Sequence, residues 1–414
     1  MKTRAPDAAF RAVHQYIEGA MRKICRPPTR HIRYPYVSIT DDETIYGNTV
    51  FCWDNHHMAI RFAYDGRPEY FRYLIDNLLA YQRRDGLTPN CVGKRTGGAA
   101  SLKAKFHAQP FLMQGACLYM DMAPDAAWLR RVFGALENYL GYYERHMRTQ
   151  DGLFVWPRTW MGGIDNDIPG TLFAPRAVIS PDLSARLHME YTAAAILART
   201  LGKREAGRRY AGRAMTLKRL IQRFFWSRKH GSYAAWNPAT GKHVFMTEDP
   251  FINPLGIGRY SFQSFSNMLP LYAGLAPKAQ AEEMIETYLL SRDHFRCAFG
   301  VRSLSRASEY YNNAVWGQGP RLSDKDRLGI SNWQGPVWIL NGHLAVNILL
   351  NYGYRREAAE VARDTVALLA RSLDTLGSFT ENYDAETGAP LYCAHFTSWN
   401  LLGDILDREV AQPD

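Results

Sequence analysis

The stretch VWILNGHLAVNILLNYGYRREAAEVARDTVALLARSLD, residues 337–374, predicts two helices that follow each other directly. In its first half, Leu340, Leu344 and Ile348 recur at the spacing of one helix face, which is typical of a helix with a buried side. Gly353-Tyr354 then interrupts the pattern as a tight turn. The sequence therefore predicts helices over 337–354 and 355–374, joined by a short connection.

Helical spacing of apolar residues recurs along most of the chain. It predicts ten further helices, near residues 6–25, 48–64, 68–84, 109–122, 125–148, 183–202, 204–226, 264–275, 277–291 and 398–410. From the second helix onward they form close pairs, and the pairs are separated by long connections at 26–47, 85–108, 149–182, 227–263, 292–336 and 375–397. Each connection exceeds the roughly 12–15 residues beyond which a loop without secondary structure is uncommon and usually functional.

The alternation of short and long connections predicts the fold. If successive helices run antiparallel, all tight turns lie on one face of the assembly and all long connections on the other. Twelve helices in this order indicate an all-α (α/α)6 toroid, in which six inner helices lie inside six outer ones, and a single domain over residues 1–414. A helical-repeat solenoid would need a repeated period of about 33–47 residues, and no such period is visible.

Composition excludes several classes of protein. With 46% hydrophobic and 22% charged residues, the chain is that of a packed protein. No apolar run approaches the roughly 20 residues that span a bilayer, so we expect no membrane partner. The N-terminus lacks the apolar core of a secretory signal, which favours a cytoplasmic protein. The six scattered cysteines form no CxxC pair, which argues against a zinc ribbon and favours reduced thiols.

The formal net charge of +10 raises the question of nucleic-acid binding. The basic residues are interpreted as spread along the chain, with local runs such as Lys203-Arg204 and Arg208-Arg209 on predicted helix surfaces. A nucleic-acid binder more often concentrates its basic residues on one stripe. We therefore expect solvated helix faces and no nucleic-acid partner, and the sequence leaves a homo-oligomer open.

An acidic segment among large aromatic residues indicates a pocket. GGIDNDIPG, residues 162–170, lies in the third long connection and is unsuited to a helix or a central strand. Ligand sites are lined by aromatic side chains and a few placed polar groups. The long connections carry Trp156, Trp160, Trp236, Tyr310, Tyr311, Trp316 and Trp333, several of which could stack on a sugar ring.

A second acidic segment lies in the sixth long connection, SFTENYDAETG, residues 378–388. Glycoside hydrolysis needs two carboxyl groups on opposite sides of the scissile bond. On a six-fold toroid the third and sixth connections are opposed, so Asp165 and Glu381 are expected to face each other across a central pocket. Asp384 to Gly388 is interpreted as a turn, which leaves Glu381 better placed to point inward.

These segments carry a resemblance. GGIDNDIPG resembles the Gly-x-Asp-Asn-Ser-Pro signature of glycoside hydrolase family 63 and its relatives. SNWQGPVW, residues 331–338, resembles their Tyr-Trp-Arg-Gly-Pro-Val-Trp motif, and TENYDAETGAP resembles their Glu-x-Tyr-Asp-Pro-x-Thr-Gly motif. FCWDNHHMAIRFA resembles their early Trp-Asp helix. The motifs follow the family's order from about residue 50 to 400, so the resemblance covers nearly the whole chain.

The resemblance implies an (α/α)6 barrel that hydrolyses α-glycosidic bonds with inversion. It implies that Asp165 is the general acid, that Glu381 is the general base and that Asp54 binds sugar hydroxyls. Compact members of the family hydrolyse mannosylglycerate or glucosylglycerate. We therefore predict an inverting α-glycosidase that acts on a small glucoside or mannoside, such as a glycosyl-glycerate or a disaccharide, and needs no cofactor.

The sequence departs from the family pattern at three places. Asp167-Ile168 replace the family's single Ser, and the Asp167 carboxylate would either help to keep Asp165 protonated or point to solvent. Gln334 stands in place of an Arg, which puts substrate contacts there in doubt. His56 and His57 are adjacent on a predicted helix and diverge by about 100°, so we expect no metal site.

Candidate substrate contacts come from the motifs and the long connections: Trp53, Asp54, Gln109, Trp160, Asn166, Trp333, Gln334 and Trp338. For Asp54, a structural hydrogen bond is the alternative. Lys94, Arg95 and Arg158 are candidates for recognising an acidic aglycone such as glycerate. The segment around 307–333 is interpreted as a lid-like insertion.

Two other functions fit a helical toroid. A sugar epimerase or polysaccharide lyase would more naturally use His or Tyr as its base, so His107 or His395 would have to line the site. A non-catalytic carbohydrate-binding protein would bind sugar without turning it over.

Overall fold

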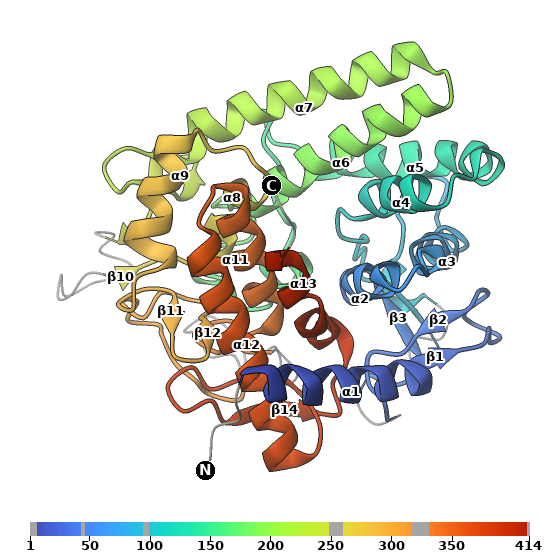
Figure 1. Cartoon of the computed structure of the whole chain (residues 1–414). Coiled ribbons are helices and arrows are strands. Elements are labelled where there is room, and N and C mark those ends of the chain that lie inside the picture. The colour runs from blue at the N-terminus through green and yellow to red at the C-terminus, as the bar shows by residue number, and fades with distance from the viewer. Residues whose placement is uncertain (1–5, 43–45, 94–98, 248–259, 317–330, 412–414) are drawn as a thin grey trace.

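The computed structural model describes residues 6–42, 46–93, 99–247, 260–316 and 331–411. In these ranges the chain is mostly helical (Figure 1). The α-helices are α1 (Pro6–Ile24), α2 (Cys52–Tyr64), α3 (Glu69–Leu79), α4 (Leu112–Met122), α5 (Ala126–His146), α6 (Pro181–Thr200), α7 (Arg204–Phe225), α8 (Leu269–Tyr272), α9 (Lys278–Met284), α11 (Ile339–Asn351), α12 (Arg355–Leu376) and α13 (Leu406–Ala411). Shorter helical turns are η1 (Ala100–Leu102), η2 (Thr159–Gly162), η3 (Gly170–Leu172), η4 (Phe265–Met268), η5 (Ile285–Leu289, a π-helix) and η6 (Ser398–Asp404).

Each of the twelve predicted helices has a helical counterpart, and the differences lie at their ends. The helix predicted over 48–64 starts only at Cys52, because the residues before it form strand β3 (Thr49–Phe51). β-branched and aromatic residues favour such an extended segment, and β3 pairs antiparallel with β4 (Cys91–Gly93). The predicted helices near 264–275 and 398–410 each begin as a 3-10 turn, η4 and η6 respectively.

The expectation of an all-α protein needs a correction, because the described residues also form seven two-stranded antiparallel sheets. Besides β3 and β4, the strands are β1 (Cys25–Arg26), β2 (Tyr36–Val37), β5 (Trp226–Ser227), β6 (Ser232–Tyr233), β7 (Ala235–Asn237), β8 (Lys242–Val244), β9 (Met246–Thr247), β10 (Tyr260–Ser261), β11 (Arg296–Cys297), β12 (Gly300–Val301), β13 (Thr380–Tyr383) and β14 (Pro390–Ala394). Most of them lie in the predicted long connections, which are therefore braced by short hairpins.

Helix packing brings the two ends of the chain together. α6 and α7 lie side by side, and α4 packs against α6 (Figure 1). α8 contacts both α6 and α11, α11 contacts η6, and η6 contacts α2, while α1 packs against α12. Buried apolar side chains from these helices belong to one continuous cluster. The last helical turns of the chain are thereby held against its second helix.

The basic residues are spread along the chain, since 39 of the 50 lie outside residues 199–229, but the net charge is concentrated. Residues 199–229 contain 11 basic side chains and one acidic side chain, so this segment carries the entire formal net charge of +10. Most of these cations lie on α7, which forms the upper edge of the molecule in Figure 1. Two of them are paired, Arg209 with Glu137 at 3.0 Å and Arg213 with Glu144 at 3.6 Å.

In the described ranges, no helix has both the length and the apolar character that crossing a membrane requires.

Candidate active site

Three carboxyl side chains from distant parts of the chain meet at one cavity. Asp54 comes from α2, Asp165 from the connection that follows η2, and Glu381 from β13. The cavity has a volume of about 150 Å³, and the rest of its lining is mainly aromatic: Ile39, Tyr46, Phe51, Trp53, Asn90, Phe106, Gln109, Trp160, Gly163, Ser331, Trp333, Trp338, Phe396 and Trp399. Such a lining offers carboxyl groups to sugar hydroxyls and rings to the C–H faces of a sugar.

The loop that carries Asp165 is shaped by the close approach of two indole rings. Gly163 has a φ of +90°, and a Cβ at this position would lie 1.4 Å from Cζ3 of Trp53. A Cβ at Gly162 would lie 2.9 Å from Nε1 of Trp156. Glycine at 163 therefore lets the backbone pass over the face of Trp53 in a conformation that other residues rarely adopt. Two residues later, Asp165 reaches the cavity.

Asp165 is a partly buried side chain with one hydrogen-bond donor from the described residues. The backbone N–H of Ser331 donates to its Oδ2 at 3.3 Å. Burial raises the pKa of Asp165 to about 7, and the charge of Asp54 contributes to the increase, while the bond from Ser331 opposes it. This carboxyl can therefore hold a proton close to neutral pH.

Glu381 is more deeply buried than Asp165 and receives more donors. The hydroxyl of Tyr46 lies 3.0 Å from Oε1 and 2.9 Å from Oε2, and Oγ of Ser331 donates to Oε1 at 2.9 Å. Burial raises the pKa of Glu381 to about 8, and the charges of Asp165 and Asp54 add to this effect. The two hydroxyl donors act in the opposite direction, because they stabilise the carboxylate.

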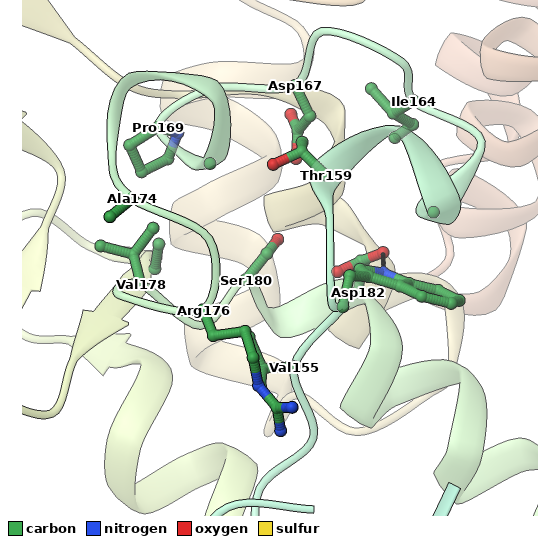
Figure 2. A pocket seen from close by; sticks show the side chains of 14 residues that line it. Val155, Thr159, Ile164, Asp167, Pro169, Ala174, Arg176, Val178, Ser180 and Asp182 are labelled. Atoms are coloured by element: carbon green, nitrogen blue, oxygen red, sulfur yellow. Dashed lines mark hydrogen bonds between the residues drawn. The ribbon is translucent and has the colours of Figure 1, made fainter. Parts of the chain in front are cut away.

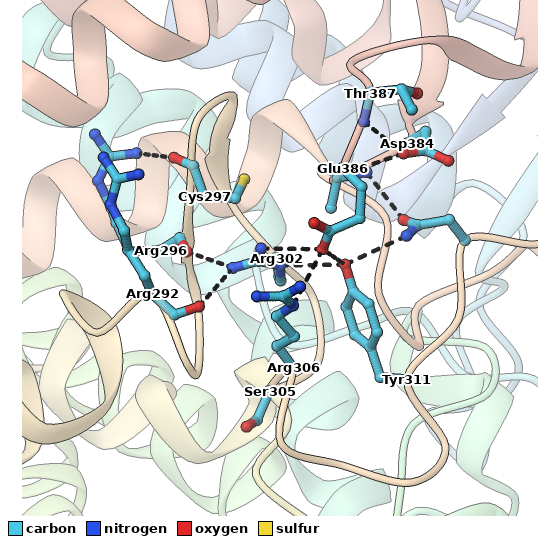
Figure 3. Close-up of polar contacts among 12 residues, drawn as sticks. Arg292, Arg296, Cys297, Arg302, Ser305, Arg306, Tyr311, Asp384, Glu386 and Thr387 are labelled. Carbon is cyan, nitrogen blue, oxygen red and sulfur yellow. Dashed lines mark hydrogen bonds and ion pairs between the residues drawn. The ribbon is translucent and has the colours of Figure 1, made fainter.

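The hairpin β13–β14 is fixed on both sides of its turn. Glu386, in the turn, accepts hydrogen bonds from Oη of Tyr311 at 2.7 Å and from Nη2 of Arg302 at 3.1 Å. Figure 3 shows these three side chains converging. On β13 itself, the backbone of Tyr383 exchanges two hydrogen bonds with Val337, at 2.8 and 3.0 Å. The strand that carries the cavity glutamate is therefore anchored from outside the cavity.

Asp54, the third carboxyl, accepts a hydrogen bond from Oγ of Ser398 at 2.7 Å. Burial raises its pKa to about 6, and the bond from Ser398 opposes the increase. Three carboxyls with raised pKa values share one small space, so the cavity does not hold three full negative charges near neutral pH.

Tryptophan rings form much of the cavity wall. Trp333 and Trp338 are stacked, with ring centroids 3.7 Å apart and an angle of 6° between the planes. Trp53 lies 5.8 Å from Trp333 at 16°, so the three rings form one stack. Trp160 contacts Phe106 edge to face at 5.0 Å. Packed rings of this kind offer a rigid surface to a ligand.

Eight of the ten predicted site residues line the cavity: Trp53, Asp54, Gln109, Trp160, Asp165, Trp333, Trp338 and Glu381. Asn166 and Gln334 are not among its lining residues. Oδ1 of Asn166 accepts a hydrogen bond from the backbone N–H of Trp333 at 2.7 Å, and Nε2 of Gln334 donates to the backbone oxygen of Asn166 at 3.0 Å. Both amides thus tie the loop 162–170 to the segment 331–338.

Asp167 lines a different and smaller cavity, of about 40 Å³ (Figure 2). Its Oδ2 accepts a hydrogen bond from Oγ of Ser266 at 2.7 Å. The side chain is 6% exposed, so it does not point to solvent. The neighbouring charge that raises the pKa of Asp165 is that of Asp54, so neither expectation for Asp167 holds.

The two adjacent histidines belong to the packing around Trp53. His56 stacks on Phe111 with centroids 4.6 Å apart, and burial lowers the pKa of His56 to about 3, so its ring is neutral. Nδ1 of His57 lies 2.9 Å from the backbone oxygen of Trp53.

In the described ranges, metal-ligating side chains come close together at His14, Glu18 and Asp404. Arg61 already pairs with two of these, at 2.7 Å from Glu18 and 2.5 Å from Asp404.

The histidines that an epimerase or lyase would need are not at the cavity. His107 is buried and accepts a hydrogen bond from the backbone N–H of Thr88 at 3.1 Å. His395 lies 2.9 Å from Asp41 and is half-exposed. The described lining contains no histidine, so the geometry does not favour histidine-based chemistry there.

Some predictions fall partly or wholly outside the described residues. Lys94 and Arg95 lie there, as does 317–330, most of the predicted insertion. Arg158 is exposed and does not line the cavity.

Sequence reasoning missed Tyr46, Ser331 and Ser398, the hydroxyl donors to the carboxyls. A serine or tyrosine in a loop gives no signal of its own.

Comparison with known proteins places these features in a family. The family model described as the mannosylglycerate hydrolase MGH1-like glycoside hydrolase domain matches residues 47–399. A mannosylglycerate hydrolase from Rubrobacter radiotolerans is 25% identical over 197 residues, a match that covers 46% of this chain. The match spans only 35% of that relative's length.

Solved structures share the fold at low sequence identity. A GH63 mannosylglycerate hydrolase from Thermus thermophilus, in complex with glucose, superposes with a TM-score of 0.69 at 18% identity, over 96% of this chain and 100% of that chain. Neutral trehalase Nth1 from Saccharomyces cerevisiae superposes with a TM-score of 0.66 at 15% identity, over 92% of this chain and 74% of that chain.

Proposed function

Because the chain belongs to the mannosylglycerate hydrolase MGH1-like glycoside hydrolase family, we propose that it is an inverting α-glycosidase acting on a small α-linked glycoside. The observation that carries the proposal is the pair of carboxyls, Asp165 and Glu381, that line one aromatic cavity. Both bond to Ser331, and this connection limits the distance between the bonded carboxylate oxygens to about 10 Å at most. That limit admits the roughly 6.5–9.5 Å of inverting glycosidases and also the roughly 5–5.5 Å of retaining ones, so the anomer of the first product decides between them.

In the proposed reaction, Asp165 donates its proton to the glycosidic oxygen as the bond from that oxygen to the anomeric carbon breaks. Glu381 accepts a proton from a water molecule, whose oxygen forms the new bond to the anomeric carbon from the opposite face. The products are the free aglycone and a sugar of inverted anomeric configuration. Asp54 is proposed to bind sugar hydroxyls, and the rings of Trp53 and Trp333 to contact the sugar.

In the substrate-free cavity, the pKa of Glu381 lies above that of Asp165, at about 8 against about 7, which is the reverse of the order these roles need. A water molecule bound to Glu381 favours its carboxylate, and a glycosidic oxygen beside Asp165 favours the protonated acid. We therefore expect substrate binding to reverse the order.

The proposed substrate is short. The cavity of about 150 Å³ is smaller than the 300–1,000 Å³ typical of sites for drug-sized ligands, which supports one sugar unit with a small aglycone. An α-glucoside or α-mannoside fits this description, and the relative that hydrolyses mannosylglycerate supports a glycosyl-glycerate among the candidates. The proposed reaction uses the side chains of the cavity and needs no cofactor.

We further propose that the helices form a single-domain (α/α)6 toroid. Support comes from the packing order of α4, α6, α8, α11, η6 and α2, and from the likeness to the Thermus and yeast enzymes. In such a toroid the long connections share one rim, where the cavity lies.

The test is a screen of α-linked disaccharides and glycosyl-glycerates with wild type and two variants, Asp165→Asn and Glu381→Gln. Loss of general acid or base catalysis is expected to lower kcat by roughly 10²–10⁴-fold in each variant. Asp167→Asn is the matched control, because it changes a buried aspartate of the same loop that lies on the other cavity.

The anomer of the first product is followed by NMR. A retained anomer would exclude inversion, and full activity of either variant would exclude its assigned role. A protein that binds sugars equally well in all forms but turns none over would instead be a carbohydrate-binding protein.

A further inference from the structure

Ser331 contacts both proposed reacting carboxyls. Its backbone N–H donates to Asp165, and its hydroxyl donates to Glu381, at 3.3 and 2.9 Å. The side chain is 5% exposed and lines the cavity. One residue therefore fixes the position of the two groups relative to each other, through two different kinds of donor.

The donors are distributed unequally between the two carboxyls. Glu381 receives hydroxyl donors from Ser331 and from Tyr46, and both of these side chains line the cavity. Asp165 receives only the longer backbone bond among the described residues. A hydroxyl that points its proton at an oxygen stabilises the charged carboxylate.

We propose that Ser331 and Tyr46 are positioning residues that assign the two roles in the substrate complex, by favouring Glu381 as the ionised base and leaving Asp165 as the group that keeps the proton. This inference rests on the proposed function. Ser331 also limits the separation of the pair, because the backbone N–H bonded to Asp165 and the hydroxyl bonded to Glu381 belong to one residue.

The inference makes a directional statement about the dependence of kcat on pH, because kcat reports the enzyme–substrate complex, in which the order of the two pKa values is expected to be reversed. A base must be ionised, so activity rises with pH through the pKa of Glu381, and an acid must be protonated, so activity falls again through the pKa of Asp165. Removing a hydroxyl donor raises the pKa of Glu381 and moves the acid limb to higher pH. The backbone N–H remains in a Ser331→Ala variant, so the basic limb stays in place.

The experiment compares pH profiles of kcat at saturating substrate for wild type, Ser331→Ala, Ser331→Thr, Tyr46→Phe and Ser266→Ala. A lost hydroxyl bond to a charged group is expected to move the acid limb of Ser331→Ala upward by about one to two pH units. Tyr46→Phe moves the same limb in the same direction. Ser331→Thr keeps a hydroxyl and restores the wild-type profile.

Ser266→Ala is the matched control. It removes a hydroxyl bond of 2.7 Å to a buried carboxyl, Asp167, which lies outside the active-site cavity. Its acid limb is expected to coincide with that of wild type.

The inference is overturned if Ser331→Ala loses activity equally at every pH, since that is the result of a purely structural role. Thermal unfolding of each variant shows that the compared proteins are folded. Failure of the inference is distinguishable from failure of the proposed function. In the first case the profiles coincide while Asp165→Asn and Glu381→Gln are inactive, and in the second those two variants are active.

Discussion

Gly163→Ala should damage the site by forcing apart the backbone at residue 163 and the indole ring of Trp53, which are in contact. A Cβ at this position would lie 1.4 Å from Cζ3 and 1.5 Å from Cε3 of Trp53, far inside any van der Waals contact. The backbone φ of +90° adds strain for a residue with a side chain, about 1–2 kcal/mol. Overpacking a filled site costs about 1–3 kcal/mol more. We expect a total destabilisation of about 2–5 kcal/mol.

The indole is less free to move than the loop. Trp53 is 4% exposed, stacks near Trp333 and has the guanidinium of Arg186 4.9 Å from its ring. The loop should therefore shift and carry Asp165 with it. Activity is expected to fall more steeply than stability, because a displacement of about 1 Å at a reacting group can cost 10²-fold in rate.

A double-mutant cycle with Trp53→Ala tests this account through urea unfolding of the four proteins. Without the ring, Gly163→Ala should cost only its backbone strain, about 1–2 kcal/mol, so the coupling energy should be about 1–3 kcal/mol. Gly202→Ala is the control, since Gly202 has a φ of +72° and nothing within 4 Å of an added Cβ. An equal cost of Gly163→Ala with and without the ring would refute the reasoning.

Two further predictions concern stability. Burial raises the pKa values of Asp167 and Glu190 to about 7, above the roughly 4 of unfolded chains. Each group therefore favours folding most at low pH, and this contribution is lost as pH rises from about 4 through 7. Urea unfolding should show a free energy that declines over this window and declines less in Asp167→Asn; no difference in slope would contradict it. Glu386→Gln weakens the bond from Arg302, and because the Glu386 side chain is 41% exposed we expect a loss of up to about 1 kcal/mol in urea unfolding, against no loss for Glu309→Gln, an exposed control on a neighbouring segment. If both substitutions changed the free energy of unfolding equally, the idea that Glu386 anchors the β13–β14 hairpin would be refuted.

Helices were predictable from the sequence because their signal is local and repeated. Leu340, Leu344 and Ile348 mark a buried face wherever the rest of the chain lies, and the helix forms there. Strands such as β3 and β4 hold three residues each, too few for a period to emerge, and their pairing partners lie about 40 residues apart. Such strand pairs were consequently missed, and the connections were expected to be less regular than they are.

The candidate site divides in the same way. Asp165 and Glu381 could be placed in one pocket because the order of long connections predicts which loops are opposed. The hydroxyls of Tyr46 and Ser331 could not be placed at Glu381 from the sequence. Tyr46 is 335 residues and Ser331 is 50 residues away from Glu381 along the chain, and each contacts it only after folding. Asn166 was predicted to contact the substrate, but it joins two loops through the backbone N–H of Trp333. A polar residue inside a motif can serve either purpose.

The positive charge on α7 and the residues next to it makes the charge distribution of the molecule asymmetric. Since residues 199–229 hold the whole net charge of +10, the remaining chain is neutral, and the isoelectric point of about 9.2 reflects this one side. At physiological salt the field of a surface charge fades within about 8 Å, so a negatively charged surface would attract the protein only when α7 faces it. A cation-exchange matrix should therefore hold the protein in one orientation. Replacing five of these arginines by glutamine would halve the net charge and leave every residue that lines the cavity unchanged.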